Sequence, residues 1–328
     1  MKARMSPLSN TDSAIAVSIV IVNWKAKDLL RQCLNSLYGT AQDLPFEVIV
    51  IDNNSGDGSC EMIRREFPGV RLIPNAENLG FARANNQGIL VSQGRYILLL
   101  NPDTIVIKKS ISGMAALLDR ERAIGAVGPA IRYPDGTIQY TCARNLPNLL
   151  TGFLDLSGLA YKYPKGRITG SWQMGYWDHN DERNVDAISG ACMMVRREVI
   201  DRIGLLDEKY FMYGEDIDWC YRITRDGWEI RYVPSAEITH FAGQSSKLFA
   251  NIVMEDFKSM CRFLKSKDGF VVAALYRLLA ITLGSLWLLY WSTYLAISKS
   301  AGSGPKREKI RKNVVPRYRT MMKWGLGV

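Results

Sequence analysis

The chain has 328 residues, a length that suggests one large domain or two smaller ones, and 47% of its residues are hydrophobic, which is enough for a sizeable core. The net charge is +10, but residues 299–328 carry +8 of it, with nine Lys or Arg against one Glu. Nucleic-acid-binding proteins more often spread basic residues over a folded face, so we expect no nucleic-acid partner.

The N-terminal segment and the cysteines bear on the cell compartment. Residues 1–16 form a polar tail without the apolar region of a signal peptide. The six cysteines show neither C-x-x-C pairs nor zinc spacing, which is typical of free thiols in a reducing compartment. We therefore expect the folded part to lie in the cytoplasm.

Short apolar runs rich in β-branched residues alternate with helical patterns from residue 17 onward. This order predicts the α/β fold class, with a doubly wound, mostly parallel sheet and helices on both faces. The predicted strands are Val17–Val22, Phe46–Ile51, Val70–Pro74, Arg95–Leu100, Ile124–Ile131, Ala187–Val195 and Glu229–Val233. The predicted helices are Lys27–Tyr38, Asn78–Ser92, Ile111–Arg120, Arg196–Ile203 and Glu215–Gly227.

Residues 132–187 do not follow this pattern. They are rich in Gly, Pro, Tyr and Trp, which indicates a variable, substrate-facing insertion. We expect His179, within this segment, to lie at the surface. The other histidine, His240, is expected in a loop after the last strand and Pro234.

The C-terminal part has membrane character. An amphipathic helix is predicted over Phe249–Leu264, and residues 278–297 contain no charge, which is long enough to cross a hydrocarbon core of roughly 30 Å. The basic tail that follows favours anionic lipid. A single span would place this tail opposite the cytoplasmic domain, against the positive-inside rule, so a span, a re-entrant hairpin and an in-plane helix stay open beside a buried core helix.

The stretch Asp207–Arg222 interleaves five carboxylates with aromatic residues. Aromatic neighbours desolvate a carboxylate and can raise its pKa toward neutrality, as a general base requires. The alternative is an ordinary helix start after Gly214, with Glu215 and Asp216 complementing the helix dipole.

Two further acidic residues follow predicted strands, where open α/β sheets bind ligands. Asp52 is placed to accept hydrogen bonds from a nucleoside. Asp103 is placed to bind a divalent cation that holds a diphosphate, and His240 is a second candidate ligand. The alternative for both carboxylates is turn and helix-cap chemistry.

Six motifs in order resemble the family 2 inverting glycosyltransferases of the GT-A fold, over about residues 17–245. The closest resemblance is to bacterial rhamnosyltransferases of cell-wall, O-antigen and exopolysaccharide assembly. The motifs are V-S-I-V-I-V-N-W, V-I-V-I-D-N-N-S-x-D-G-S, N-L-G-F-A-R-A-N-N-Q-G, L-L-L-N-P-D-T, S-G-A-C-M-M-V-R-R and Y-F-M-Y-G-E-D-I-D-W-C-Y-R.

The resemblance implies a role for each matching residue. Asp216 would be the general base, with Glu215 beside it. Asp103 would be the last acid of a D-x-D metal motif, in which Asn101 replaces the first acid, and His240 would reach the metal, Mg²⁺ or Mn²⁺. The nucleotide-sugar would contact Asn23, Asp52, Asn54, Asn78, Gly80 and Asn101, and the acceptor would contact Gly190, Ala191 and Cys192.

The resemblance also implies a domain plan. A GT-A domain would occupy residues 17–248, with a nucleotide-sugar half at 17–131, the insertion at 132–187 and an acceptor half at 188–248. Membrane-associated helices would occupy 249–298 and the basic tail 299–328.

The implied activity is inverting transfer of a sugar from a dTDP- or UDP-sugar to a hydroxyl of a lipid-linked or polysaccharide acceptor. We expect L-rhamnose from dTDP-rhamnose, at the cytoplasmic face of the bacterial plasma membrane and against its anionic surface. UDP-galactofuranose or a UDP-hexose is the alternative donor. A dinucleotide oxidoreductase is disfavoured because no glycine follows the first strand, and a non-catalytic scaffold is disfavoured because Asp103 and Asp216 are present.

Overall fold

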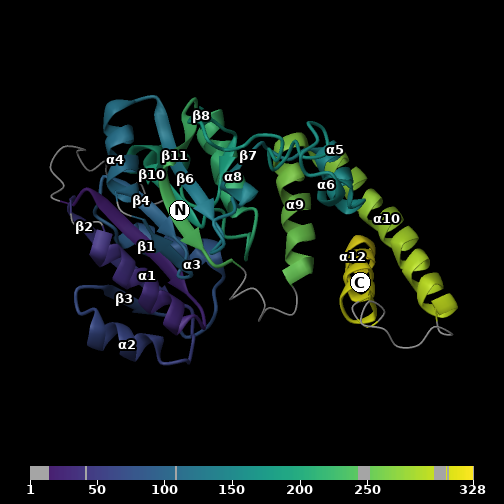
Figure 1. Ribbon diagram of the computed structural model, residues 1–328, viewed down its shortest axis with the longest axis horizontal. Coiled ribbons are helices and arrows are strands. Elements are labelled where there is room, and N and C mark those ends of the chain that lie inside the picture. Colours follow the sequence, from purple (N-terminus) through teal and green to yellow (C-terminus); the bar gives the residue numbers. More distant parts are fainter. Residues whose placement is uncertain are drawn as a thin grey trace, which may run out of the picture. The chain divides into compact units, whose positions relative to one another are not determined.

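The computed structural model describes residues 15–40, 43–107, 109–242, 252–298, 308 and 310–327. Most of the predicted polar tail, the first residues of the predicted amphipathic helix, and residues 299–307, 309 and 328 of the basic tail lie outside the described residues. The chain forms two compact units (Figure 1). One comprises residues 15–146 and 177–242, and the other comprises residues 147–176 and 252–327.

The first unit is built on a mixed sheet with the strand order β3-β2-β1-β4-β10-β6-β11-β5, and β8 pairs with β11. The pairs β1–β2, β1–β4, β2–β3 and β6–β11 are parallel, whereas β10 runs antiparallel to both of its neighbours. The strands are β1 (Val17–Asn23), β2 (Phe46–Asp52), β3 (Arg71–Pro74), β4 (Tyr96–Leu100), β5 (Thr104–Val106), β6 (Ile124–Arg132), β8 (Arg183–Asn184), β10 (Cys192–Arg196) and β11 (Glu229–His240).

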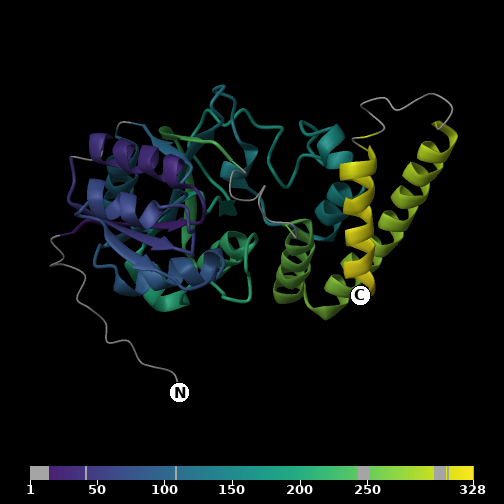
Figure 2. The same ribbon diagram turned by 90° about the horizontal axis from the view of Figure 1, so that it is seen from below.

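Helices flank this sheet (Figure 2). The central strands β1 and β4 are buried along their whole length, as expected for continuous apolar runs covered on two faces. The predicted mostly parallel α/β sheet is therefore confirmed. The helices are α1 (Lys27–Thr40), α2 (Ser59–Glu66), α3 (Phe81–Val91), α4 (Ser110–Arg120), α7 (Arg197–Ile203) and α8 (Glu215–Arg225).

The predicted strand Ala187–Val195 is wrong as a single element. Its first part, β9 (Ala187–Ile188), pairs with β7 (Ala143–Arg144) in a separate two-stranded sheet. Its last part is β10, in the main sheet. The chain turns between the two, where Cys192 N donates to Ser189 O at 3.2 Å. One continuous apolar run therefore contributes a strand to each of two sheets, and the residue pattern alone does not show where the run divides.

His240 does not lie in a loop after a short strand, as predicted, because β11 continues to it. Pro234 falls in the register shift between Val233 and Glu237, where β11 loses its regular pairing with β6. Proline lacks the N–H that a ladder needs, so it is accommodated at such an irregularity, and the strand resumes beyond it. His240 then pairs with Thr104 of β5.

The surface position predicted for His179 is also wrong. Its side chain is buried, with its ring 4.1 Å from that of Trp177, and Tyr232 donates its hydroxyl to His179 O at 2.9 Å. Burial lowers the pKa of His179. The aromatic neighbours thus hold a neutral imidazole in the interior.

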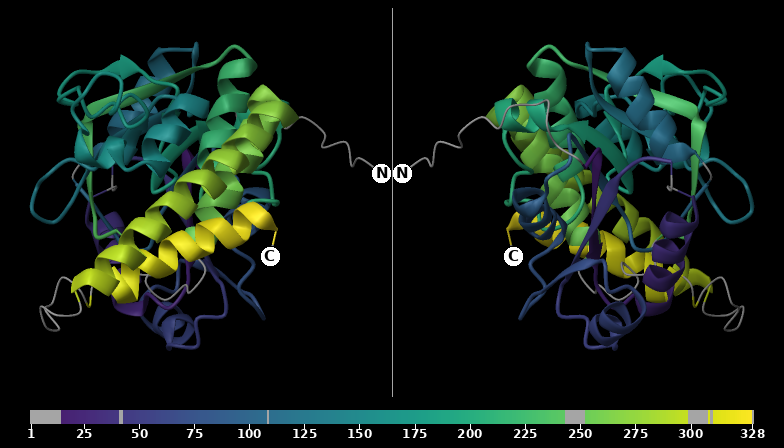
Figure 3. Two further views of the ribbon diagram at one scale, coloured as in Figure 1. Left: turned by 90° about the vertical axis from the view of Figure 1, so that its right-hand side faces the viewer. Right: turned by 90° about the vertical axis from the view of Figure 1, so that its left-hand side faces the viewer.

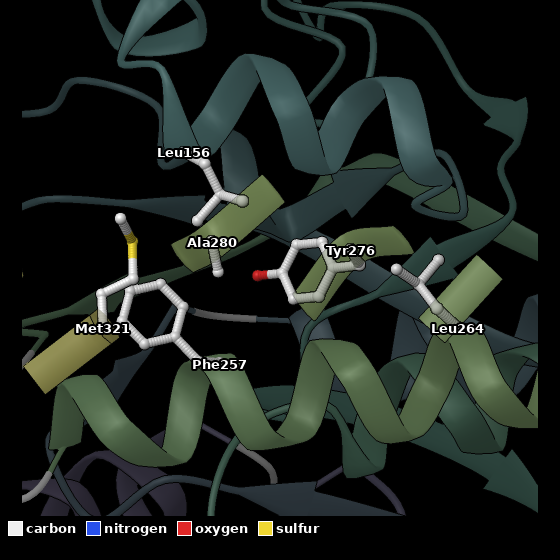
Figure 4. Packing of buried hydrophobic residues seen from close by; sticks show 6 residues of the cluster. All are labelled: Leu156, Phe257, Leu264, Tyr276, Ala280 and Met321. Carbon is white, nitrogen blue, oxygen red and sulfur yellow. The ribbon is translucent and has the colours of Figure 1, made fainter. Parts of the chain in front are cut away.

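The second unit is helical. Its elements are α5 (Leu149–Leu156), α6 (Leu159–Lys162), α9 (Ile252–Asp268), α10 (Phe270–Ile297), the short η4 (Ile310–Val314) and α12 (Val315–Leu326). Residues 147–176, from the predicted insertion, pack with the C-terminal helices in this unit. Its core is shown in Figure 4 and consists of Leu156, Phe257, Leu264, Tyr276, Ala280 and Met321.

Candidate functional site

Asp52 and Asn23 lie side by side at the ends of β2 and β1, where the parallel register pairs them. Asn23 Nδ2 donates to Asp52 Oδ2 at 2.8 Å, and Ser55 N donates to Asp52 Oδ1 at 3.0 Å. Both side chains are buried, and Asn23 Oδ1 finds no hydrogen-bond partner among the described residues. An unpaired buried carbonyl is costly, so a ligand N–H or O–H at this sheet edge would satisfy it.

Asn54, the next predicted ligand of the nucleotide-sugar, is exposed and has a φ of 59°. Asn78 and Gly80 instead take part in a loop network. Asn78 Oδ1 accepts from Gly80 N at 3.0 Å and from Asn53 Nδ2 at 3.2 Å. The amide of Asn78 therefore fixes the turn that leads into α3.

Gly80 lets this turn approach the acidic stretch closely. Its φ is +81°, and an added Cβ would lie 2.5 Å from Phe211 O. The next residue, Phe81, donates its N–H to the same oxygen at 2.7 Å. The absence of a side chain at Gly80 thus allows the start of α3 to contact the loop that precedes α8.

Asp103 and His240 meet beyond the end of β4, as the metal prediction requires. His240 Nε2 lies 3.1 Å from Asp103 Oδ1 and 3.2 Å from Asn101 Nδ2. The side chains of His240 and Asp103 are only 12% and 7% exposed. Pairing of β11 with β5 brings together residues that are far apart in the sequence.

Gln139 determines which ring nitrogen of His240 carries the proton. Gln139 Nε2 donates to His240 O at 2.7 Å, which leaves Gln139 Oε1 facing His240 Nδ1 at 3.0 Å. An amide oxygen only accepts, so Nδ1 bears a hydrogen, and it is Nε2 that presents the lone pair when the ring is neutral. That lone pair and Asp103 Oδ1 are both acceptors, and a cation or a proton between them would relieve their repulsion.

This arrangement fits a divalent metal. Metal-binding histidines usually donate their second ring N–H to an oxygen acceptor, as His240 does to Gln139. Within the described ranges no group of three or more His, Cys, Asp and Glu side chains is placed to hold an ion. Asp103 and His240 would therefore supply two ligands, which suits Mg²⁺ or Mn²⁺ shared with the oxygens of a diphosphate.

Asp216 lies in the first turn of α8, which begins after Gly214 (φ 84°). Its Oδ2 accepts from Arg144 Nη2 at 2.6 Å and from Gly190 N at 3.1 Å, and its Oδ1 accepts from Ile217 N at 2.8 Å. Both oxygens of Asp216 therefore act as acceptors, and one of the three donors is the buried guanidinium of Arg144. Oδ1, with a single protein donor, keeps room for a further hydrogen bond.

Glu215 is more deeply buried than Asp216. Burial, together with the neighbouring charge of Asp216, raises the pKa of Glu215 to about 8. Its Oε2 has no hydrogen-bond partner in the part of the chain described. Its surroundings therefore favour the protonated form of Glu215 beside Asp216.

The three predicted acceptor contacts lie in different environments. Gly190 adjoins Asp216, since a Cβ at Gly190 would lie 3.4 Å from Asp216 Cβ. Ala191 O accepts from Asn101 N at 2.9 Å, and this hydrogen bond joins the turn to the loop that carries Asp103. Cys192 begins β10 and is buried, which raises the pKa of its thiol. Gly190 is thus the one of the three that adjoins Asp216.

The site contains two clusters of residues. The first consists of Asp103, His240 and Asn101, and the second consists of Asp216, Glu215 and Gly190. The main chain of Ala191 joins the second cluster to the first. Asn23 and Asp52 lie at the neighbouring strand ends. Two contributors, Arg144 and Gln139, were not predicted. Both come from the irregular segment after β6, where no motif marks them and only the β7–β9 pairing and the end of β11 bring them to the site.

Comparison with known proteins identifies relatives. The family model described as Glycosyl transferase family 2 matches residues 18–204. The N-acetylglucosaminyl-diphospho-decaprenol L-rhamnosyltransferase of Mycobacterium tuberculosis is 34% identical over 239 residues, which cover 70% of this chain and 76% of that protein. Rhamnosyltransferase WbbL of Escherichia coli is 26% identical over 262 residues, 76% of this chain and 93% of that protein.

The fold is also shared with solved structures. The mannosyltransferase PcManGT from Pyrobaculum calidifontis, in complex with GDP-Man and Mn²⁺, has a TM-score of 0.56 and 15% sequence identity. The match covers 99% of this chain and 88% of that one. At this identity the similarity shows the fold.

Proposed function

The chain belongs to glycosyl transferase family 2 and has the GT-A fold, and from this premise we propose that it transfers a sugar from a nucleoside diphosphate to an acceptor hydroxyl with inversion at the anomeric carbon. The observation that carries the proposal is the position of Asp216, whose Oδ2 is held by Arg144 Nη2 and Gly190 N while its Oδ1 keeps room for a further hydrogen bond. Burial and the charge of Asp216 raise the pKa of the adjacent Glu215, and neighbouring carboxyls whose environments push their pKa values apart are typical of acid–base sites.

The proposed reaction uses Asp216 as general base. The acceptor hydroxyl donates its proton to Asp216 Oδ1 while its oxygen attacks the anomeric carbon from the face opposite the leaving diphosphate. Arg144 and Gly190 N hold Oδ2, which fixes the direction of Oδ1. Burial raises the pKa of Glu215, which disfavours a second negative charge beside the proposed base.

The donor site is proposed along the strand ends. Asn23 and Asp52 would bind the nucleoside, with Asn54, Asn78, Gly80 and Asn101 beside it. Asp103 and His240 would hold Mg²⁺ or Mn²⁺, which when bound neutralises charge on the diphosphate. Gly190 and Ala191 would contact the acceptor. The names of the two bacterial relatives favour rhamnose as the transferred sugar, and the first name also favours a lipid-linked acceptor. We propose dTDP-L-rhamnose as the donor and a lipid-linked or polysaccharide acceptor of the cell envelope.

We also propose that the protein works at the cytoplasmic face of the bacterial plasma membrane, with residues 17–248 as the transferase domain, residues 249–298 as membrane-associated helices and the basic tail on anionic lipid. The observation that supports membrane association is α10, which is long and apolar enough to cross a membrane yet has only 22% of its apolar window buried.

A donor screen tests the activity. Purified protein with Mg²⁺ or Mn²⁺ is offered dTDP-rhamnose, UDP-galactofuranose, UDP-N-acetylglucosamine and UDP-glucose, and release of nucleoside diphosphate is followed. We expect turnover of dTDP-rhamnose, a loss of at least about 100-fold in Asp216→Asn with donor binding retained, and no change in the exposed control Asp28→Asn. Equal turnover in both variants would show that Asp216 is not the base.

A further inference from the structure

Helix α10 exposes an apolar stripe along its length. Leu275, Leu278, Leu286 and Leu289 are 44%, 57%, 58% and 66% exposed, and their spacings of three and eight residues place them on one face of the helix. The buried residues Ala273, Tyr276, Ala280 and Gly284 lie on the opposite face. The stripe therefore points away from the core of the second unit.

Helix α12 runs back along the first part of α10, and Figure 3 shows the two helices side by side. Arg277 Nε donates to Gly325 O at 2.6 Å, and the rings of Trp287 and Tyr318 stack at 5.9 Å. Gly284 lies against Met321 between these two contacts. The two helices are thus antiparallel over Arg277–Trp287.

This packing places charges beside the uncharged segment. Arg317, Arg319 and Lys323 of α12 are exposed. If residues 278–297 crossed the hydrocarbon core, α12 would be drawn into it as well, and each charge at the bilayer centre disfavours insertion by about 100-fold. A re-entrant hairpin of α10 and α12 is disfavoured for the same reason, because it would carry the same charges of α12 into the core.

We propose that α10 lies in the plane of the membrane surface, with its leucine stripe at the boundary between headgroups and acyl chains. The basic residues of α12 and the tail reach anionic headgroups, since long Arg and Lys side chains extend toward charge while their stems stay on apolar surface. Tyr290, which is 54% exposed, suits the same interface. This inference rests on the proposed membrane association and specifies its geometry.

The topology is tested by labelling a single cysteine beyond α10. Glu308→Cys is introduced into the full chain, with the partly accessible Cys60 and Cys261 replaced by serine. Inverted plasma-membrane vesicles, with the cytoplasmic face outward, are treated with a membrane-impermeant maleimide. We expect full labelling without detergent. Retention in the membrane with labelling only after detergent would overturn the in-plane arrangement and leave membrane association intact.

The stripe is tested by vesicle binding. Leu286→Ser is compared with Leu90→Ser, because Leu90 of the first unit is equally exposed at 57%. We expect Leu286→Ser to reduce partitioning into phosphatidylcholine vesicles containing phosphatidylglycerol about 10-fold, and Leu90→Ser to leave it unchanged. The wild-type protein should bind more weakly to vesicles of pure phosphatidylcholine. Equal effects of the two variants, or no binding to either kind of vesicle, would overturn the proposal. Sugar transfer is measured separately, so that a failure of this proposal can be distinguished from a failure of the proposed function.

Discussion

Arg144 Nη2 lies 2.6 Å from Asp216 Oδ2, and this ion pair joins the short strand β7 to the first turn of α8. The two side chains are 10% and 14% exposed, so the pair is largely shielded from water. Arg144 Nε has no hydrogen-bond partner within the described part of the chain, so Asp216 is the charged group that holds this guanidinium.

Arg144→Ala should destabilise the protein and impair transfer. Removing one partner of a buried pair leaves the other charge uncompensated, and we expect the free energy of unfolding to fall by about 3 kcal/mol. Because Arg144 orients Asp216, kcat should fall more than KM rises. Arg202→Ala, which breaks the more exposed pair with Asp226, should cost less than about 1 kcal/mol in urea unfolding. Equal losses would contradict a special role for Arg144.

Glu215→Gln should change how stability depends on pH. The folded pKa of Glu215, about 8, lies above the ordinary glutamate value of 4.5, so the folded protein binds an extra proton between these values. Its contribution to stability is therefore present below about pH 4.5 and is lost as pH rises toward 8.

Glutamine stays neutral, so Glu215→Gln should gain stability relative to the wild type across that window, on the order of a few kcal/mol by pH 8. Thermal unfolding from pH 5 to pH 9 measures the difference. The exposed variant Glu198→Gln serves as control, and we expect its difference from the wild type to stay constant. A constant difference for Glu215→Gln as well would show that Glu215 is not protonated in the folded state.

Gln139→Leu should weaken metal binding without touching a metal ligand. It removes the acceptor that keeps the proton on His240 Nδ1, and loss of such a partner typically costs 10- to 100-fold in affinity, about 1.4–2.7 kcal/mol. Free Mn²⁺ in the presence of dTDP is followed by electron paramagnetic resonance. Gln32→Leu, on the exposed side of α1, should bind Mn²⁺ like the wild type. Unchanged affinity in Gln139→Leu would argue that His240 is not a ligand.

Gly80→Ala should be more damaging than Gly136→Ala. Both glycines have positive φ, +81° and +83°, so an alanine is strained at either position. Gly80 also has a ψ of 178°, which places its backbone in a region that is essentially restricted to glycine. Only at Gly80 does the new Cβ meet a backbone oxygen, at 2.5 Å, whereas at Gly136 nothing lies within 4 Å. Urea unfolding of the two variants measures the combined cost at Gly80, and equal losses would show that the loop at Phe211 can move away from the new side chain.

Candidate site residues could be predicted from the sequence where they directly follow a buried strand. Asp52 and Asp103 could be expected at one sheet edge because parallel strands end together, and the structure places both there. Arg144 and Gln139 could not be predicted, because their neighbours are set by tertiary pairing and not by a local pattern. The surface position predicted for His179 was wrong for a related reason. The polar sequence around His179 does not show that Trp177 and Tyr232 enclose its ring in the folded protein.

The hydrogen bond from Asn101 N to Ala191 O has a consequence for how this enzyme can change over evolution. It joins the loop beside Asp103 to the turn beside Asp216 through two main-chain groups, so among side-chain replacements only proline at position 101 would remove it. The spacing between Asp103 and Asp216, the proposed metal ligand and the proposed base, is therefore set independently of most nearby side chains. Under the proposed mechanism, replacements of those side chains can change the sugar that binds while the direction of attack stays the same.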